Sequence, residues 1–412
     1  MTALTDAEPT SAEPSPATPE GPRRRGRGRR RHSVGKIILT VVVVLAMATG
    51  LGMVFLYRHF NGNLNVLDVN GQLHNRPAKV HVEGPQEPLN VLVMGSDTRQ
   101  GKGNRVDNQT DIGQRSDTTI LMHLSADRTR AYGISIPRDS AVNRPPCQTS
   151  KGASIPGASH VLWNDAFSVG GPACTIQQFE QLTGIRLDHY VVVDFNGFKG
   201  MVDAIGGVRV CIPEPIVDPH HGINIPAGTR KLEGQQALNY VRERYVVGNG
   251  SDIGRMKRQQ AFIASMAHQV VTAGTLARPD RLIRFLESAT KSLTLDKGLD
   301  NLSKIAGLGN DFRGIGLDNI QFLTIPNTVD PTNPNHLVWT AQARQVWHKI
   351  ANDEPLTRRL ATDVISAGSV PGQKHPSGPG SSSPSASPAG KHSKKSPNGP
   401  DAQTLADAGL CA

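Results

Sequence analysis

NVLVMGSDTR (residues 90–99) decides the fold of this chain, because an apolar run ends there in glycine, aspartate and arginine. Two similar junctions follow: RSD (115–117) precedes the run TTILMHL, and PRD (137–139) follows the run AYGISI. Short apolar runs bounded by turn residues are typical of buried strands. We therefore expect three strands whose ends carry Asp and Arg side chains.

The turn SADRTR (125–130) sets the register of the second and third strands, because its Asp residue suits a tight hairpin turn. If Leu124 pairs with Ala131, antiparallel pairing places Asp117 directly opposite Arg138. A slip of one residue would separate these two side chains across the sheet, so the register decides whether they meet.

One edge of the expected sheet then holds four charged side chains. If the first run lies antiparallel to the second, Asp97 and Arg115 reach the edge that carries Asp117 and Arg138. Carboxylates suit a hard cation such as Mg²⁺, and arginine binds phosphate oxygens through paired N–H groups. The alternative is a network of surface ion pairs, each of which contributes only ~0–1 kcal/mol. The repetition at three strand ends favours a site for a metal and a polyphosphate.

A second group of arginines lies downstream, in VRERYVVGNGSDIGRMKRQQ. Arg242 and Arg244 alternate, so both face one side if that segment is extended. After a Gly/Asn/Ser loop, Asp252 is expected to cap a helix on which Arg255 and Gln259 share one face. A solvated basic helix face is the simpler interpretation, but arginines crowded around one loop repel one another unless a polyanion binds.

The N-terminal region predicts a membrane anchor. Lys and Arg (45) exceed Asp and Glu (35), yet RRRGRGRRRH at 23–32 alone supplies seven arginines. The uncharged run Ile37–Tyr57 is long enough, at ~1.5 Å per residue, to span the ~30 Å core of a bilayer. A cleaved signal peptide would have a shorter apolar region and a small-residue cleavage site. The positive-inside rule keeps the arginines cytoplasmic and the chain after Arg58 outside, so we expect no nucleic-acid partner.

Strand-length runs alternate with helical patterns from Leu89 onward. This order predicts an α/β (α+β-like) fold with a mixed central β-sheet flanked by helices. Segments rich in Pro, Ser and Gly at both ends predict disorder. The expected organisation is a disordered basic cytoplasmic tail at 1–36, a transmembrane signal anchor at 37–57, a stalk at 58–88, a folded extracytoplasmic domain at 89–357 and a disordered Pro/Ser/Gly/Lys-rich tail at 366–412.

Four cysteines, Cys147, Cys174, Cys211 and Cys411, all lie beyond the anchor and form no CxxC pair. A zinc ribbon is therefore not expected, and an even number outside the membrane favours disulfides. We prefer a bond between Cys147 and Cys174, because both lie in the loop-rich stretch after PRD. Cys211 and Cys411 would then pair with each other or stay as free thiols.

Other motifs fail on spacing. GSDTRQGKG resembles a phosphate-binding loop, but it is one residue too long and Lys102 lacks a following Ser or Thr. GISIP around Ser135 is not G-x-S-x-G, so no nucleophilic serine is expected. His220 and His221 look like a metal pair, but adjacent histidines point apart in most conformations, and an exposed loop is the simpler interpretation.

The chain resembles the LytR-CpsA-Psr family in motifs that occur in order from residue 89 to about 270: NVLVMGSDTR, RSDTTILMHL, ISIPRDS, LTGIRLDHYVVVDFNGFKGMVDAIGGVRVCIP, GQQALNYVRER and SDIGRMKRQQ. The resemblance implies a phosphotransferase that moves a teichoic acid or another glycopolymer from a polyprenyl-pyrophosphate carrier to peptidoglycan. The acceptor is a muramic acid hydroxyl, and the product is a phosphodiester. The implied fold is a mixed sheet with an apolar groove for the lipid chain.

The resemblance also implies roles for individual residues. Asp97 and Asp117 match the metal-associated carboxylates, and together with Arg138 they form the expected catalytic group. The expected cofactor is Mg²⁺, with Mn²⁺ as the alternative. The expected pyrophosphate-binding residues are Arg115, Arg138, Arg242, Arg244, Arg255 and Gln259.

The implied reaction is an attack by a sugar hydroxyl on the phosphorus that bears the glycan, with release of polyprenyl phosphate. Hydrolysis of lipid pyrophosphates is an alternative, because water can replace the sugar hydroxyl at the same site. A tethered, non-catalytic module that binds polyanions and regulates the envelope is the second alternative.

Overall fold

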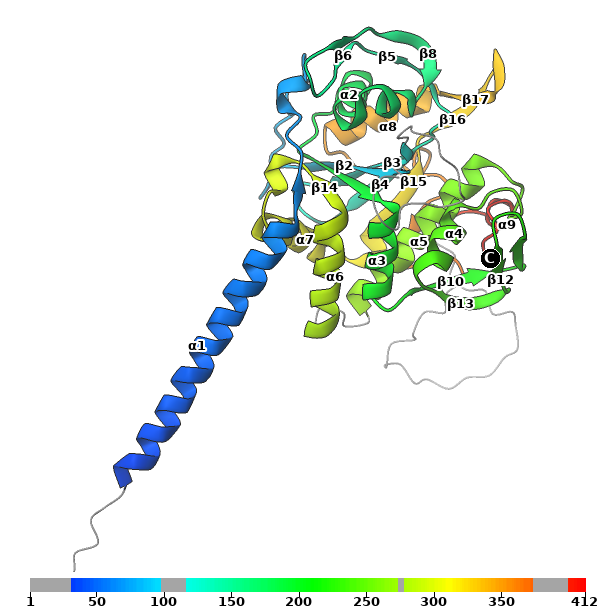
Figure 1. The fold of residues 1–412 in the computed structure, drawn as a ribbon. Coiled ribbons are helices and arrows are strands. Elements are labelled where there is room, and N and C mark those ends of the chain that lie inside the picture. Colours follow the sequence, from blue (N-terminus) through cyan, green and yellow to red (C-terminus); the bar gives the residue numbers. More distant parts are fainter. Residues whose placement is uncertain (1–30, 98–115, 273–277, 373–398) are drawn as a thin grey trace, which may run out of the picture. The chain divides into compact units, whose positions relative to one another are not determined.

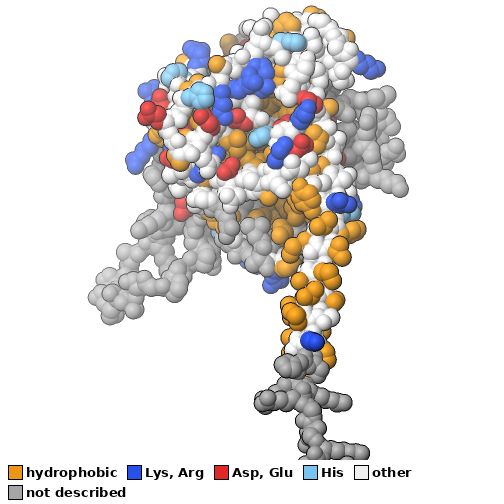
Figure 2. Space-filling view, turned by 90° about the vertical axis from the view of Figure 1, so that its left-hand side faces the viewer, with side chains coloured by type: hydrophobic (Ala, Val, Ile, Leu, Met, Phe, Trp, Pro, Cys, Tyr) orange, Lys and Arg blue, Asp and Glu red, His pale blue; other side chains and the backbone are white. Residues whose placement is uncertain are grey.

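The computed structural model describes residues 31–97, 116–272, 278–372 and 399–412 (Figure 1). These residues fall into two compact units that divide between Leu56 and Tyr57. Helix α1 (Arg31–Asn63) contains the expected anchor and is long and apolar enough, over Val34–Asn63, to cross a membrane. Figure 2 shows hydrophobic side chains along most of this helix. Its length and composition therefore agree with a membrane span.

The core of the second unit is an eight-stranded mixed sheet, which confirms the expected fold class. Strands β2–β3–β4 are antiparallel neighbours, whereas β9 lies parallel to β2 and β15 lies parallel to β4. In sheet order the strands are β1 (Asn65–Val66), β14 (Leu293–Leu295), β9 (His189–Asp194), β2 (Leu89–Ser96), β3 (Ser116–Leu124), β4 (Ala131–Ile136), β15 (Ile320–Thr324) and β18 (Ile365–Ser366).

The β3–β4 hairpin has the register expected from its turn. Leu124 pairs with Ala131, and Thr119 pairs with Ile136 at the other end of the ladder. The same register, continued beyond the ladder, sets Asp117 opposite Arg138. Strand β2 lies antiparallel to β3, as expected, with one irregularity between Gly95 and Ser96.

The two faces of the sheet are covered by different helices (Figure 1). Because side chains alternate along a strand, Leu92, Met94 and Leu121 share one face, where they join the main hydrophobic core with residues of α2 (Asp165–Thr183) and α8 (Ala341–Ala351).

The opposite face carries Val93, Ile120 and Ser135. The side chain of Gln260 on α5 (Asp252–Thr272) donates to Ser135 Oγ at 2.9 Å, which places α5 on this face. Helices α3 (Phe195–Ala204) and α4 (Gly234–Arg242) pack beside α5. Between these three helices and the sheet lies the cavity described below.

Smaller hairpins and helices surround these two layers. The hairpins are β6 (Cys147–Gln148) with β7 (Ser154–Ile155), β11 (Ile216–Asp218) with β12 (Ile223–Ile225), and β16 (Asn327–Asp330) with β17 (Asn333–Trp339). Two further antiparallel pairs enclose the first two hairpins in sequence: β5 (Ala141–Arg144) with β8 (Ala158–Leu162), and β10 (Val208–Ile212) with β13 (Gly228–Leu232). The remaining helices are α6 (Pro279–Ser292), α7 (Leu302–Arg313) and α9 (Ala402–Asp407), with 3₁₀ turns at Asn70–Gln72, Lys297–Leu299 and Leu317–Asn319.

The segment 58–88 is not the stalk that its sparse apolar residues predicted. Phe60, Val69 and Leu73 are buried, and β1 extends the central sheet by pairing with β14. Lys79 forms an ion pair with Asp188 at 2.6 Å. Isolated apolar residues give no periodic signal in a sequence, but each of these fills a place in the folded domain.

The C-terminal region also differs from the prediction of a disordered tail at 366–412. Ala367 and Val370 are buried next to β18, and residues 399–412 form α9 and pack Leu405 and Leu410 into a hydrophobic cluster. Residues 373–398 lie outside the described part of the chain.

Two disulfides close the second unit. The expected bond between Cys147 and Cys174 is confirmed, with a Cα–Cα distance of 5.3 Å. Cys211 and Cys411 are also bonded, with a Cα–Cα distance of 5.7 Å across 200 residues of sequence. This second bond explains the ordered C-terminus, because it fixes residues next to α9 against strand β10.

Candidate active site

Arg138 and Asp117 meet at the edge where the β3–β4 hairpin ends. Arg138 Nη1 lies 2.8 Å from Asp117 Oδ1, so the pairing expected from the register is confirmed at the level of side chains. Asp97 directly follows β2 and is half-buried. Arg115 lies outside the described residues.

Asp252 is the carboxylate that joins both groups of arginines. Its oxygens lie 2.9 Å from Arg138 Nε, 3.0 Å from Arg244 Nη1 and 3.1 Å from Arg255 Nη2. The expected capping role falls instead to Ser251, whose Oγ accepts a hydrogen bond from the backbone N–H of Gly254 at 3.1 Å. The two sequence segments with arginines therefore form one cluster, which we call the arginine cluster: Arg138, Arg244 and Arg255.

Asp139 completes the cluster and was not among the predicted site residues. Arg138 Nε lies 3.5 Å from Asp139 Oδ1. Burial, together with a hydrogen bond to Asp252 and the charge of that residue, raises the pKa of Asp139 to about 6. Burial alone would raise the pKa of Asp252, but the hydrogen bond with Asp139 and the charges of Arg255 and Arg138 lower it. The two carboxyl groups therefore titrate together, and Asp139 holds the proton only below about pH 6.

Arg255 is buried, and the negative charge near it does not offset the cost of burying its own positive charge. Its side chain is 8% exposed, and its Nε is buried without a hydrogen-bond partner among the described residues. Burial, followed by the charge of Arg138, lowers the pKa of Arg255 despite the nearby Asp252. An anion bound beside Arg255 would satisfy the unpaired N–H and offset the repulsion between the guanidinium groups.

Arg242 reaches the site in a different way from the extended segment that was expected. Helix α4 ends at Arg242, whose guanidinium carbon lies 4.6 Å from the centre of the Phe195 ring. Arg244 follows in the loop after the helix. Both arginines still line the same cavity, so they face one side as expected, although the segment is not extended.

Gln259 lies one helical turn after Arg255 on α5. Its Oε1 accepts from Thr118 Oγ1 at 3.2 Å, and its Nε2 donates to the Val241 carbonyl at 3.1 Å. These contacts tie α5 to β3 and to α4. The neighbouring Arg258 is buried and donates to the Ala408 carbonyl at 3.0 Å, so it supports the C-terminal segment.

A cavity of about 650 Å³ extends from the arginine cluster along the inner face of α5. Its polar part is lined by Asp117, Arg242 and the arginine cluster. Along α5 the lining changes from Arg255 and Gln259 to apolar residues and ends at Met266, a distance of about 16 Å at ~1.5 Å per residue. Apolar side chains form most of the remaining wall: Val93, Ile120, Val193, Phe195, Phe198, Met201, Ile223, Leu238, Val241, Phe262 and Ile263.

His221 also lines this cavity, which the interpretation of an exposed loop did not anticipate. The ring is exposed, as expected, but its Nδ1 lies 2.5 Å from Asp218 Oδ2. The Asp three residues before His221 was the only available signal in the sequence. Asp252 and Asp139 were visible in the SDIGR and PRD motifs, but no local pattern showed that they meet.

The carboxylates at the strand ends fit the metal that was expected. Asp97 and Asp117 offer only oxygen donors, which a hard divalent cation prefers. One oxygen of Asp117 binds Arg138, and the side chain is 30% exposed and borders the cavity. The chemistry of this donor pair therefore suits Mg²⁺ or Mn²⁺ next to a phosphate group.

Comparisons with known proteins find similar chains. The LytR_cpsA_psr family model matches residues 57–352. A probable cell wall biosynthesis protein, LcpB of Corynebacterium glutamicum, is 36% identical over 230 residues, which are 55% of this chain and 52% of that protein. The polyisoprenyl-teichoic acid–peptidoglycan teichoic acid transferase TagV of Bacillus subtilis is 28% identical over 277 residues, 65% of this chain and 66% of that protein.

The chain thus spans between about half and two thirds of the length of these relatives. Among solved structures, protein gbs0355 from Streptococcus agalactiae matches with a TM-score of 0.51 and 21% identity, over 66% of this chain and 89% of that one. A likeness at this identity shows the fold alone.

Proposed function

We propose, from the premise that this chain belongs to the LytR-CpsA-Psr family, that it is a phosphotransferase acting on a polyprenyl-pyrophosphate-linked glycopolymer. The acceptor in this proposal is a muramic acid hydroxyl of peptidoglycan, and the product is a phosphodiester. Relatives named as teichoic acid transferases and cell wall biosynthesis proteins support a role in wall assembly.

The observation that carries the proposal is a single cavity with two chemically different parts. One part presents arginines, among them Arg255 with its unsatisfied N–H group, and the other presents a long apolar wall. A ligand that fits both parts carries a strongly anionic group attached to a long hydrocarbon chain. A polyprenyl pyrophosphate has this composition, whereas a free nucleotide or a soluble sugar phosphate leaves the apolar wall empty.

The proposed reaction follows from this placement. The acceptor hydroxyl attacks the phosphorus that bears the glycan, a new P–O bond forms, and the bond to the bridging oxygen breaks. The leaving group is polyprenyl phosphate, whose added negative charge faces the arginine cluster. Mg²⁺ or Mn²⁺ held by Asp97 and Asp117 would supply further positive charge to the phosphate oxygens when bound.

The proton of the acceptor hydroxyl needs a base near the strand ends. Asp97 and Asp117 were the expected candidates, and Asp139 is a third, because a pKa of about 6 suits a group that accepts a proton near neutral pH. No covalent enzyme intermediate is required in this scheme, since the hydroxyl attacks the phosphorus directly.

The proposed location is the outer face of the cell membrane, with α1 as a single-pass anchor and the N-terminus in the cytoplasm. Two disulfides support an oxidising compartment for residues 57–412. The proposed substrates are available there, because lipid-linked glycan and peptidoglycan meet outside the membrane.

The experiment that tests the proposal incubates the full chain in detergent with Mg²⁺, a polyprenyl-pyrophosphate-linked sugar and peptidoglycan fragments. Mass spectrometry should find a phosphodiester adduct and free polyprenyl phosphate. Sugar phosphate without an adduct would support the hydrolase alternative. Binding of the lipid without any turnover would support the non-catalytic module and overturn the proposed transfer.

A further inference from the structure

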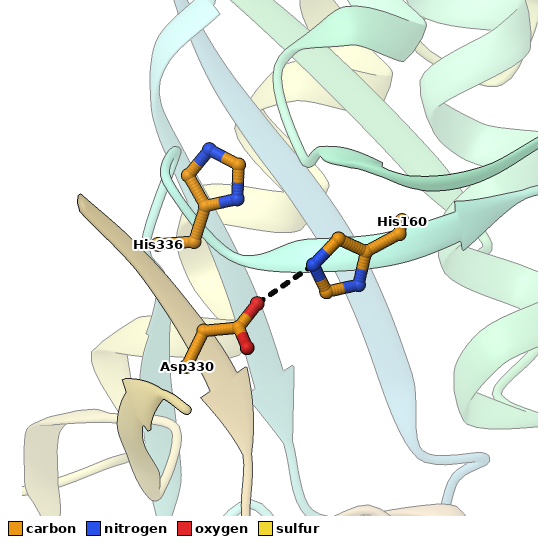
Figure 3. Close-up of side chains that lie close together, drawn as sticks. All are labelled: His160, Asp330 and His336. Carbon is orange, nitrogen blue, oxygen red and sulfur yellow. Dashed lines mark ion pairs between the residues drawn. The ribbon is translucent and has the colours of Figure 1, made fainter. Parts of the chain in front are cut away.

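Three side chains outside the cavity, His160, Asp330 and His336, converge from strands β8, β16 and β17 (Figure 3). One ring nitrogen of each histidine and one oxygen of Asp330 lie within 4.8 Å of one another. The ring centres are 6.0 Å apart. Two imidazoles that bind one ion through Zn–N bonds of ~2.0–2.1 Å have ring centres roughly 5–6 Å apart, so the spacing is close to that of a shared metal.

Asp330 presents a buried oxygen to this cluster. Its side chain is 2% exposed, and its Oδ1 accepts from the backbone N–H and the hydroxyl of Thr332 at 2.8 and 2.7 Å. Its Oδ2 forms an ion pair with His160 Nε2 at 2.7 Å, the contact drawn in Figure 3. Two ligands of one tetrahedral ion with bonds of ~2.0–2.1 Å lie roughly 3.3 Å apart, so metal binding would replace this ion pair and move the two atoms slightly apart.

His336 offers an uncommitted ring nitrogen. Its Nδ1 is buried and has no hydrogen-bond partner among the described residues, while its Nε2 lies 3.2 Å from Asn333 Nδ2. Asn333 Oδ1 accepts from the backbone N–H of Asn335 at 3.0 Å, which fixes the amide in this orientation. Without a metal, His336 Nε2 is therefore the acceptor, and Nδ1 carries the proton.

We propose that His160, Asp330 and His336 form a site for one divalent transition-metal ion of the zinc class, with water as the fourth ligand. Two imidazole nitrogens and one carboxylate oxygen are a donor set that zinc accepts, whereas Mg²⁺ prefers oxygen alone. Loading shifts the ring proton of His336 from Nδ1 to Nε2, and it requires Asn333 to turn its oxygen toward Nε2–H.

Metal at this site would stiffen a strand that contacts the backbone directly after Arg138. Leu337, next to His336 on β17, donates its backbone N–H to the carbonyl of Asp139 at 3.0 Å and bridges to Ser140. The ion would link β8 to the β16–β17 hairpin, so the loop that carries Arg138 would be held from both sides. The inferred role is structural, and it does not depend on the proposed transfer reaction.

The test is equilibrium dialysis of the full chain in detergent against buffered Zn²⁺, with metal analysis, and against Co²⁺, with absorption spectroscopy. The wild-type chain should bind one ion in competition with a Mg²⁺ excess, and its unfolding temperature should rise with Zn²⁺. His160→Ala and His336→Ala should weaken binding about 100-fold and lose that rise. His221→Ala, in the separate cluster with Asp218 and Glu243, is the matched control and should bind like wild type.

Asn333→Asp makes the test independent of damage to the fold. An aspartate oxygen can accept from His336 Nε2–H while the other keeps the Asn335 contact, so affinity should increase about tenfold. Wild-type affinity in His336→Ala, or no binding by the wild-type chain, would overturn the site. Unchanged affinity in Asn333→Asp would overturn the assignment of Nδ1 as the ligand.

Discussion

Replacement of Arg138 by alanine should damage both the reaction and the fold, because this side chain bridges two carboxylates. It binds Asp117 at 2.8 Å and Asp252 at 2.9 Å, and its own side chain is only 21% exposed. Burial alone would lower the pKa of Arg138, but the charges of Asp117 and Asp252 outweigh it and raise the pKa. The guanidinium is therefore strongly held in its charged form by the folded protein.

The magnitude follows from these contacts. A hydrogen bond to a charged group contributes about 1.5–3 kcal/mol, and Asp252 keeps Arg244 and Arg255 as partners, so Arg138→Ala should lower the free energy of unfolding by roughly 2–4 kcal/mol. Loss of one group that stabilises charge in the transition state should lower the transfer rate about 10²–10³-fold. Arg138→Lys keeps the charge but has one ammonium group for two carboxylates, so we expect intermediate effects.

Both quantities should be measured on the same preparations, by urea unfolding and by the initial rate of polyprenyl phosphate release. Arg284→Ala is the matched control, because Arg284 is 61% exposed and pairs only across one helical turn with Asp280. It should change the unfolding free energy by less than ~0.5 kcal/mol. A transfer rate in Arg138→Ala within about threefold of wild type, with folded protein confirmed, would refute the assignment of this site.

The remaining predictions concern the proton of Asp139, the disulfide between Cys211 and Cys411, and the apolar wall of the cavity. Asp139 has a raised pKa of about 6, so the folded state binds its proton more tightly than the unfolded state, and stability should fall by up to ~2 kcal/mol as the pH rises from about 4 to 6. Asp139→Asn should abolish that slope in urea titrations. Ionisation of Asp139 adds a negative charge to the cavity edge, so affinity for a diphosphate diester should fall over the same pH range, and Asp139→Asn should remove that fall as well. Cys411→Ser should lower the free energy of unfolding by about 2–5 kcal/mol, because the bond to Cys211 closes a loop of 200 residues; an unchanged urea midpoint would contradict this. Met266→Asp should weaken binding of a long polyprenyl pyrophosphate at least tenfold by calorimetry and leave a short, water-soluble analogue unaffected; equal losses for both would show that the chain does not reach this end of the cavity.

Much of the sheet edge that carries Asp117 and Arg138 could be predicted, because it depends on pairing between neighbouring strands. The turn at 125–130 determines the β3–β4 register, and the register alone brings Asp117 to Arg138. The alternation of apolar side chains in β2 and β3 was equally local, and it determines which residues face the cavity. The anchor helix needed only length and composition.

The contact between Asp252 and Arg138 could not be predicted, because it joins segments that are more than 100 residues apart. The sequence context of Asp252 indicates a helix cap, and only the packing of α5 against the sheet brings Arg138 to it. The same packing leaves the Arg255 Nε without a hydrogen-bond partner in the described part of the chain, and it raises the pKa of Asp139. Both properties depend on burial by segments that are distant in sequence, and the residues next to Arg255 and Asp139 in the chain do not show which segments these are.

Local sequence features were thus enough to predict the main strands, the hairpin register, the anchor helix and the kinds of side chain available for an anion and a metal. These features arise from periodicity and turn chemistry within a few residues. Only the tertiary structure decided that the NVLVMGSDTR strand end and the distant arginine loop form one site, that an apolar cavity continues from it, and that Cys411 returns to Cys211. Such contacts depend on which distant surfaces pack together, and that is settled by the burial of side chains across the whole domain.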